Sequence, residues 1–208
     1  MEKDWKEHWN KRFAEEEYAY GTKPNVFFAE CLEKYNLSSD ILFPNEGEGR
    51  NAAYAAKKGL NVTAFDMSEE GKKKALKLAS DNNVKINYVL GEFSDCEFEP
   101  ESFEVIVLVF AHYPESVREE YHKKLITYLK KNGMLILIGF SEEHLKYNSV
   151  NPSVGGPKNI KVLYSLNQIK NDFAELELLE LNEDIVVLDE GAYHKGESSV
   201  ITFVGKRL

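Results

Sequence analysis

The sequence predicts an α/β fold in which parallel strands alternate with helices. Short runs of β-branched and apolar residues alternate along the chain with longer amphipathic stretches, and this change of hydrophobic period is typical of βαβ units. Two of the short runs, residues 105–110 and 135–138, are apolar at every position. Central parallel strands have this pattern because helices cover both of their faces. We therefore expect these two runs at the middle of the sheet.

The expected elements follow one another in a regular order. Residues 2–17 are expected to form an amphipathic helix that places Trp5, Trp9 and Phe13 on one apolar stripe. Strands are expected over residues 41–43, 61–65, 86–90, 104–110 and 134–140, with helices over residues 49–58, 69–80 and 115–130 between them. Ser68 precedes two carboxylates, which favours it as a helix cap and ends the second strand at residue 66 or 67. Asn132 and Gly133 are expected to stop the last of these helices.

The last third of the chain has a different character. Residues 141–161 are polar and contain Asn-Pro and Gly-Gly-Pro, which predicts a long loop on the substrate side, since such loops commonly shape binding sites. A short helix is expected over residues 166–173. Residues 176–188 and 199–204 are expected to form an antiparallel pair, joined by a turn and the polar residues 193–197.

Composition limits the possible functions. The 208 residues carry 26 Lys and Arg against 35 Asp and Glu, a net charge of −9, and the length suits one domain over residues 1–208. This acidic balance disfavours nucleic-acid binding, which depends on clustered cations, so a small-molecule partner is expected. The longest apolar runs fall short of the roughly 20 residues that cross a bilayer. With no apolar signal core at the N-terminus, we expect a cytoplasmic protein without a membrane partner.

The metal-ligating residue types show no metal pattern. Cys31 and Cys96 are too few for a disulfide framework and are expected to be reduced thiols. The five histidines, the cysteines and the carboxylates lack spacings such as C-x-x-C or H-E-x-x-H, so no metal site is expected. We expect a monomer or a weak dimer.

Residues 41–68 carry the densest functional signal: a strand, a glycine turn, a helix, a second strand and an acid. Gly47 and Gly49 would let a ligand approach the backbone at the carboxyl end of the first strand, where open α/β sheets bind ligands. Asp66 ends the second strand and can accept hydrogen bonds from two ribose hydroxyls. Alternatively, the glycines only make a tight turn and Asp66 caps a helix.

The same glycines satisfy a second pattern. Gly47-x-Gly49-x-x-Ala52 fits the dinucleotide-binding fingerprint, so an NAD(P)-binding oxidoreductase is the alternative function. The Tyr-x-x-x-Lys pair that would indicate a short-chain dehydrogenase occurs once, as Tyr54 and Lys58. It lies on the first helix after the glycine turn rather than beyond the fourth strand, which is the wrong place.

Four short motifs follow one another along the chain: EGEGRNA at residues 46–52, Asp-x-Ser at 66–68, FAH-x-P at 110–114 and EG-x-x-H-x-G at 190–196, preceded by YG-x-x-PN at 20–25. In this order they resemble the class I S-adenosylmethionine (SAM) dependent methyltransferases. They look closest to small bacterial enzymes grouped with the tellurite-resistance and thiopurine methyltransferases. The resemblance implies a Rossmann-like, doubly wound, seven-stranded and mostly parallel sheet with an antiparallel last strand. It also implies a helical N-terminal lid over residues 1–36 and SAM as the cofactor.

Three positions depart from the family pattern. Asn45 stands where the loop usually has its first glycine, and Phe43 stands where the first strand often has an acid. Glu92 stands where an Asp or Asn commonly receives the adenine amino group. These departures leave open a second alternative, a SAM-binding module without catalytic activity.

The resemblance also implies which residues contact the cofactor. On the methionyl side these are Arg12 and Tyr20 for the carboxylate, Glu46 or a loop carbonyl for the ammonium, and Gly47 and Gly49 for close approach. On the nucleoside side they are Asp66 for the ribose, Met67 for the adenine face, and Glu92 with the Phe93 amide for the adenine edge. The alternative for Met67 is a buried core side chain, and for Arg12 a solvated helix residue.

Methyl transfer is an in-line displacement that needs little acid–base machinery. Most of the acceleration comes from orienting the reactants and excluding water, and a base helps only when the acceptor must lose a proton. His112, Tyr113 and His194 are the candidate catalytic residues, and for both histidines the alternative is a structural, hydrogen-bonded ring. The expected acceptor is a small molecule, such as a thiol, a chalcogen oxyanion or a similar nucleophile.

Overall fold

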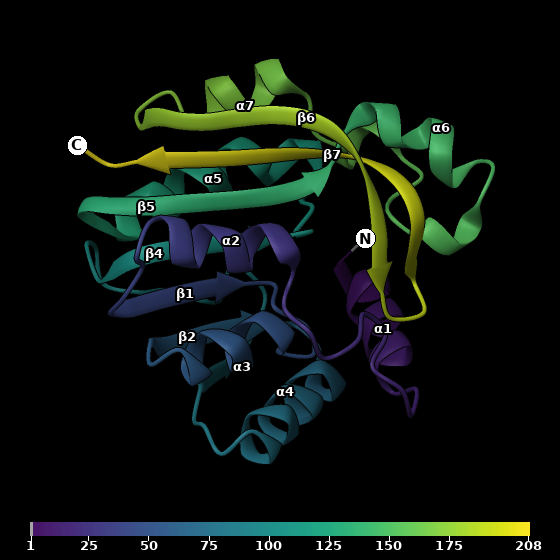
Figure 1. Ribbon diagram of the computed structural model, residues 1–208, viewed down its shortest axis with the longest axis horizontal. Helices are drawn as coiled ribbons and strands as arrows, with labels where there is room; N and C mark the ends of the chain where they lie inside the picture. The colour runs from purple at the N-terminus through teal and green to yellow at the C-terminus, as the bar shows by residue number, and fades with distance from the viewer. Residues whose placement is uncertain (1) are drawn as a thin grey trace.

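The computed structural model describes residues 2–208, with side chains from Trp5 onward, so Met1 of the expected domain and lid lies outside the described residues. A seven-stranded sheet in the order β3-β2-β1-β4-β5-β7-β6 runs through the molecule (Figure 1). Strands β1 to β5 are parallel to one another, whereas β7 is antiparallel to both β5 and β6. This topology confirms the predicted sheet. The strands are β1 (Asp40–Pro44), β2 (Asn61–Asp66), β3 (Asn87–Leu90), β4 (Phe103–Val109), β5 (Leu129–Phe140), β6 (Glu177–Glu190) and β7 (His194–Lys206).

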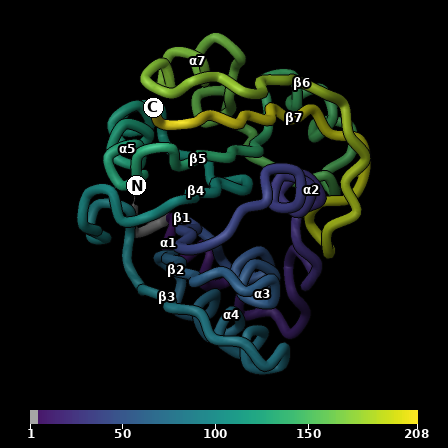
Figure 2. Tube along the Cα trace, turned by 60° about the vertical axis from the view of Figure 1, so that its left-hand side comes forward, coloured from purple at the N-terminus to yellow at the C-terminus, as the bar shows by residue number. Residues whose placement is uncertain are grey.

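Helices cover both faces of the sheet. On one face, α2 (Val26–Lys34) and α3 (Arg50–Lys57) pack their apolar residues on β1, β2 and β4. On the other face, α5 (Glu115–Tyr128) and α7 (Leu166–Asp172) pack on β4, β5 and β7. Figure 2 shows α2 and α3 on the side of the sheet opposite to α5. The fully apolar runs therefore lie in β4 and β5, which are covered on both faces, as predicted.

The helix α4 (Glu69–Asp81) begins where its cap predicts. The Ser68 hydroxyl accepts a hydrogen bond from the amide of Gly71 at 3.1 Å, and β2 ends at Asp66. This contact satisfies one of the free amides of the first helical turn.

The predicted stop of α5 is wrong by two residues. The helix ends at Tyr128, and β5 begins at Leu129, which pairs with Phe103 of β4. Asn132 does adopt a left-handed conformation, with φ +65°, but within the first part of β5. Its amide donates to the carbonyl of Arg207 at 2.8 Å, so pairing with the C-terminal segment replaces the helix end that the local sequence predicts.

The predicted extents of three other segments are also corrected. Helix α1 (Glu2–Phe13) ends four residues before residue 17. Residues 141–161, predicted as a loop, contain α6 (Leu145–Asn148) and the 3₁₀ turns Glu142–His144 and Pro152–Val154. The polar residues 194–197 belong to β7 because the hairpin ladder extends to the pair Glu190 and His194.

Only part of the expected lid lies over the glycine turn. Phe13 of α1 lies against the turn, where a Cβ on Gly47 would approach its ring to 3.0 Å, and Asn10 accepts a hydrogen bond from Ser68 at 2.8 Å. In contrast, α2 buries Phe28 and Cys31 against the sheet. Helix α2 is therefore a layer of the core, and the prediction of a lid over residues 1–36 is corrected to α1 and the segment that follows it.

Two features are absent from the described residues. Between residues 2 and 208, no helix combines the length and apolar character needed to span a bilayer. Over the same residues, no group of three His, Cys, Asp or Glu side chains is arranged to hold a metal ion.

Candidate active site

A cavity of about 1070 Å³ lies at the carboxyl ends of β1, β2 and β4. The segments that follow these strands form its floor, α1 covers it, and residues 148–162 and the β6–β7 hairpin form its far wall. The predicted site residues that line it are Arg12, Tyr20, Glu46, Gly47, Asp66, Met67, Glu92, Phe93, His112, Tyr113 and His194. The fold therefore brings together all but one of the residues that the sequence indicated.

The exception is Gly49. Both Gly47 and Gly49 have left-handed φ angles, +64° and +83°, but only Gly47 lines the cavity. A Cβ on Gly49 would lie 2.5 Å from the Cβ of Ala75 in α4. Gly49 thus allows α3 and α4 to approach each other, whereas Gly47 is the glycine that a ligand in the cavity can approach.

Glu46 caps the start of α3. Its Oε1 accepts hydrogen bonds from the amides of Asn51 and Ala52, both at 2.8 Å. Burial raises the pKa of Glu46 to about 7, although the Ala52 amide and the Asn51 side chain oppose this shift. Its Oε2 has only a long contact of 3.4 Å with the Asn51 side chain. A ligand cation beside Oε2 would favour the ionised carboxylate.

Asp66 connects the end of β2 to the glycine turn. Its Oδ1 accepts from the Ser68 amide at 2.8 Å, and its Oδ2 accepts from the Gly47 amide at 3.1 Å. Burial raises the pKa of Asp66 to about 6 against the effect of these amides. A carboxylate has about four acceptor sites, so Asp66 has capacity for a ribose hydroxyl while it holds the turn.

Three further predicted residues lie beside Asp66 in the cavity wall: Met67, Glu92 and Phe93. The Phe93 side chain is 4% exposed and stacks on Tyr121 with ring centres 4.1 Å apart. Met67 and Glu92 are half-buried. An apolar side chain, an aromatic ring and a carboxylate therefore line one part of the wall, a combination that suits a purine.

Arg12 and Tyr20 are in contact in another part of the cavity wall. The Arg12 guanidinium donates to the Tyr20 hydroxyl at 3.3 Å and lies 3.9 Å from the centre of the Tyr193 ring. The Tyr193 hydroxyl donates to the carboxylate of Glu15, with O···O distances of 2.8 and 3.0 Å. These contacts join the lid to the tip of the β6–β7 hairpin.

His112 does not fit the catalytic role predicted for it. Its Nδ1 lies 2.8 Å from the carbonyl of Val162, and its Nε2 accepts from the amide of Phe140 at 3.1 Å. Burial lowers the pKa of His112 to about 3, so the ring is neutral. With one nitrogen donating and the other accepting, neither is left for a substrate. The adjacent Tyr113 is likewise buried, and its hydroxyl donates to Asn45 at 2.8 Å.

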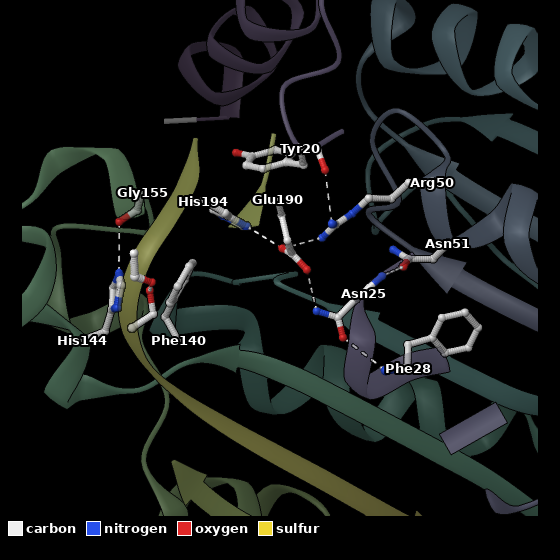
Figure 3. Close-up of polar contacts among 12 residues, drawn as sticks. Tyr20, Asn25, Phe28, Arg50, Asn51, Phe140, His144, Gly155, Glu190 and His194 are labelled. Carbon is white, nitrogen blue, oxygen red and sulfur yellow. Dashed lines mark hydrogen bonds and ion pairs between the residues drawn. The ribbon is translucent and has the colours of Figure 1, made fainter. Parts of the chain in front are cut away.

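His194 is placed differently. Its Nδ1 lies 3.0 Å from Oε2 of Glu190, and no hydrogen bond joins Nε2 to the rest of the described chain (Figure 3). The ring is 3% exposed and forms part of the cavity wall. Burial lowers the pKa of His194, and the hydrogen bond to Glu190 opposes this shift. His194 therefore has one nitrogen held by a carboxylate and one available to a molecule in the cavity.

A polar network that the sequence did not predict lies behind His194. Glu190 also accepts hydrogen bonds from Arg50 and from the Asn25 side chain, both at 2.9 Å (Figure 3). Burial would raise the pKa of Glu190, but the hydrogen bond from His194 and the charge of Arg50 lower it to about 2. Asn25, Arg50 and Glu190 each belong to one of the sequence motifs. Membership of a motif was thus a signal, but nothing in the sequence showed that the three side chains meet.

Comparisons with known proteins agree with this geometry. Residues 45–133 match the family model of a methyltransferase domain. The tRNA (uracil(54)-C(5))-methyltransferase of Pyrococcus furiosus is 28% identical over 192 residues, which cover 86% of this chain and 41% of the relative. The ubiquinone biosynthesis O-methyltransferase of Rickettsia bellii is 30% identical over 115 residues, which cover 54% of this chain and 48% of the relative. The chain thus spans less than half the length of these two relatives.

A solved structure shows the same fold. TehB from Haemophilus influenzae superposes with a TM-score of 0.71 at 17% identity, over 88% of this chain and 62% of that chain. The matched domain includes the glycine turn, so these findings favour the methyltransferase interpretation of the turn over the dinucleotide one. Residues 45–133 thus match a methyltransferase domain, and the chain as a whole has the fold of TehB.

Proposed function

We propose that this protein transfers the methyl group of SAM to a small-molecule nucleophile. The observation that carries the proposal is the single cavity at the strand ends. Groups suited to SAM line one part of it, and a histidine with an available nitrogen lines another. Bound SAM would supply an electrophilic methyl group on a sulfonium.

The donor set of the cavity fits SAM. Glu46 offers Oε2 to the ammonium, Arg12 offers its guanidinium to the carboxylate, and Asp66 has remaining acceptor capacity for the ribose. Met67 and Phe93 offer apolar surface to the adenine, with Glu92 at its edge. A volume of about 1070 Å³ lies at the upper end of the range for small-molecule sites, which accommodates a cofactor together with a small acceptor.

The chain's own residues orient the reactants and exclude water. Trp5, Trp9 and Phe13 of α1 contribute apolar surface over the cavity, and the contacts of Arg12 hold this helix to the hairpin. Orientation and exclusion of water account for much of the acceleration in a displacement of this kind. His194 is the residue that we propose for proton transfer, in place of His112 and Tyr113.

We propose a small-molecule acceptor because of the net charge of the chain. The chain carries a net charge of −9, and nucleic-acid binding requires clustered cations, which supports a small molecule such as a thiol, a chalcogen oxyanion or a similar nucleophile. The ubiquinone O-methyltransferase relative favours a small acceptor, whereas the tRNA methyltransferase relative favours RNA. Unmodified tRNA should therefore be tested as an acceptor beside small molecules, and methylation of tRNA alone would contradict a small-molecule acceptor.

The first test is calorimetric titration of the protein with SAM, S-adenosylhomocysteine, NAD and NADP. Saturable binding of the first two and none of the nicotinamides is expected. Asp66→Ala should weaken SAM binding by at least about tenfold, because it removes a charge-assisted partner and loosens the Gly47 amide. The matched control is Asp81→Ala, which changes an exposed carboxylate at the end of α4 and should leave SAM affinity unchanged. Equal affinities in the two variants would remove Asp66 from the site.

A further inference from the structure

The surroundings of His194 restrict the chemistry of the acceptor. We infer that the methyl acceptor is a neutral aromatic hydroxyl or thiol, and that His194, oriented by Glu190, accepts its proton. This inference rests on the proposed function and deepens it, because that proposal leaves the acceptor class open.

The first argument is the orientation of the imidazole. The Glu190 carboxylate accepts three hydrogen bonds, from His194, Arg50 and Asn25, at 3.0, 2.9 and 2.9 Å. It therefore remains ionised, and an ionised carboxylate beside Nδ1 selects the tautomer that carries its proton on Nδ1. The lone pair is then on Nε2, the nitrogen that no described residue occupies. An acceptor that arrives without a proton would have no use for this arrangement.

The second argument is the aromatic lining. The ring of His194 lies 4.4 Å from the centre of the Tyr20 ring, 4.6 Å from that of Phe110 and 5.2 Å from that of Phe140. All three rings line the cavity. Rings favour other rings at such distances, in stacked or edge-to-face geometry. A flat aromatic acceptor fits this surface better than a compact polar one.

The backbone geometry at Phe110 also supports an aromatic acceptor. Phe110 follows β4 directly and has φ +53°, a left-handed conformation that is unfavourable for a bulky residue. Its amide is held by the carbonyl of Ile138 at 2.8 Å, and its ring stacks on Phe140 with centres 4.5 Å apart. Strained residues of this kind cluster at functional sites. Here the strained residue contributes an aromatic ring to the wall beside His194.

The third argument is charge. The cation nearest to Glu190 is Arg50, which is buried and paired with it. Arg12 is the cation that we propose for the SAM carboxylate, and Lys158 is exposed on the far wall. The sulfonium of bound SAM would attract an oxyanion, but an oxyanion at Nε2 of His194 would also meet the field of the Glu190 carboxylate, which no further cation among the described residues offsets. A neutral acceptor avoids this repulsion.

The chemical step balances with these groups. The proton of the acceptor O–H or S–H moves to Nε2 of His194, and a lone pair of that oxygen or sulfur forms the new bond to the methyl carbon. The bond between the methyl carbon and the sulfonium breaks, and its electron pair stays on sulfur. The resulting imidazolium is stabilised by Glu190 until the proton passes to water.

The test compares acceptors that differ in ionisation. Phenol, 4-methylphenol and phenylmethanethiol supply ring-bearing acceptors that carry a proton at pH 6.5. Pentafluorothiophenol and 2,4-dinitrophenol supply acceptors that are already ionised there, and selenite and tellurite supply oxyanions without a ring. Wild-type protein should methylate the protonated aromatic acceptors. His194→Gln should lower kcat/KM for these by about 100-fold or more, and by under about threefold for the ionised aromatics.

The Glu190→Gln variant tests orientation of the ring. It should lower kcat/KM selectively for the protonated acceptors, in the same direction as His194→Gln but by less, because the base remains and only its orientation is lost. Glu183→Gln, an exposed carboxylate on the same strand, is the matched control and should leave both acceptor classes unaffected. Thermal unfolding of each variant separates loss of fold from loss of the proton acceptor.

Nitrogen NMR of histidine side chains gives a readout that needs no turnover. In wild-type protein with S-adenosylhomocysteine, His194 should show the Nδ1–H tautomer near neutral pH, and Glu190→Gln should give a mixture of tautomers. An Nε2–H tautomer in the wild type, an equal loss for both acceptor classes, or turnover of selenite or tellurite alone would overturn the inference. So would SAM binding without methylation of any aromatic acceptor. Absence of SAM binding in the calorimetric test would instead remove the proposed function itself.

Discussion

Two histidines of one cavity differ in what their ring nitrogens do. His112 uses both nitrogens on backbone groups, of Val162 and Phe140, and so ties β5 to the segment that precedes α7. His194 uses one nitrogen on Glu190 and leaves the other to the cavity. At the residue scale, His112 therefore contributes to stability, and His194 is the one suited to chemistry.

His112→Gln should destabilise the fold by about 1–3 kcal/mol at pH 7.5, because a buried amide or carbonyl loses its partner. Burial lowers the pKa of His112 to about 3, below its unfolded value of 6.5, so its contribution is complete above pH 6.5 and is lost as the pH falls. The destabilisation by the variant should thus shrink between pH 6.5 and pH 4, by up to about 1.4 kcal/mol per pH unit. Urea unfolding across this range measures it.

The control for this prediction is His8→Gln, which changes an exposed ring on α1. It should alter the free energy of unfolding by less than about 0.5 kcal/mol. A difference between His112→Gln and wild type that stays constant from pH 7.5 to pH 4 would contradict the assignment of a buried neutral ring.

At the scale of elements, the packing of α3 against α4 depends on one glycine. Gly49 begins α3 in a left-handed conformation, and the backbone of Ala75 lies where its Cβ would be, since the added atom would come within 2.7 Å of the Ala75 Cα. The backbone of Ala75 cannot move away from an added Cβ as easily as a flexible side chain could. The two helices hold this distance because no side chain separates them.

Gly49→Ala should therefore destabilise the protein by about 2–5 kcal/mol, the sum of left-handed strain and overpacking. Gly59 is the matched control, because it also has a positive φ, +92°, but an added Cβ would meet nothing within 4 Å. Gly59→Ala should cost only the strain, about 1–2 kcal/mol. The urea unfolding midpoints of the two variants measure this difference. Equal midpoints would mean that the contact between residue 49 and α4 does not affect stability.

At the scale of the whole molecule, Glu190 joins parts of the chain that are far apart in sequence. Asn25 precedes α2, Arg50 begins α3, and Glu190 ends β6, so one carboxylate links both halves of the sheet at the cavity. Arg50 also donates to the carbonyl of Tyr20 at 3.2 Å, which includes the segment after α1. The site is complete only when the hairpin docks on these segments.

Arg50→Ala should lower the free energy of unfolding by about 3 kcal/mol, because it leaves the Glu190 carboxylate, which is only 11% exposed, without its cation. The control is Lys58→Ala, whose partner Glu33 is exposed, and it should cost less than about 1 kcal/mol. Chemical denaturation measures both. A cost for Arg50→Ala no greater than that of Lys58→Ala would show that the hairpin docks without this ion pair.

The fold could largely be read from local patterns. The hydrophobic period located the central strands, Ser68 marked the start of α4, and the order of elements gave the parallel half of the sheet, because burial on both faces and helix capping are properties of neighbouring residues. The predicted boundaries of elements were wrong where pairing with a distant strand sets the boundary. Asn132 pairs with the C-terminal segment, and His194 continues a ladder with Glu190, so the predicted helix stop and the predicted turn were displaced.

The sequence by itself determined the fold class and the location of the cavity, because motifs at the ends of parallel strands meet at one edge of the sheet. Only the tertiary structure decided which motif residues serve that cavity. Gly47 and Gly49 look alike in sequence, as do His112 and His194, yet one of each pair is committed to packing or to the backbone. The partners that commit them, Ala75, Val162 and Phe140, lie far away along the chain and become neighbours only on folding.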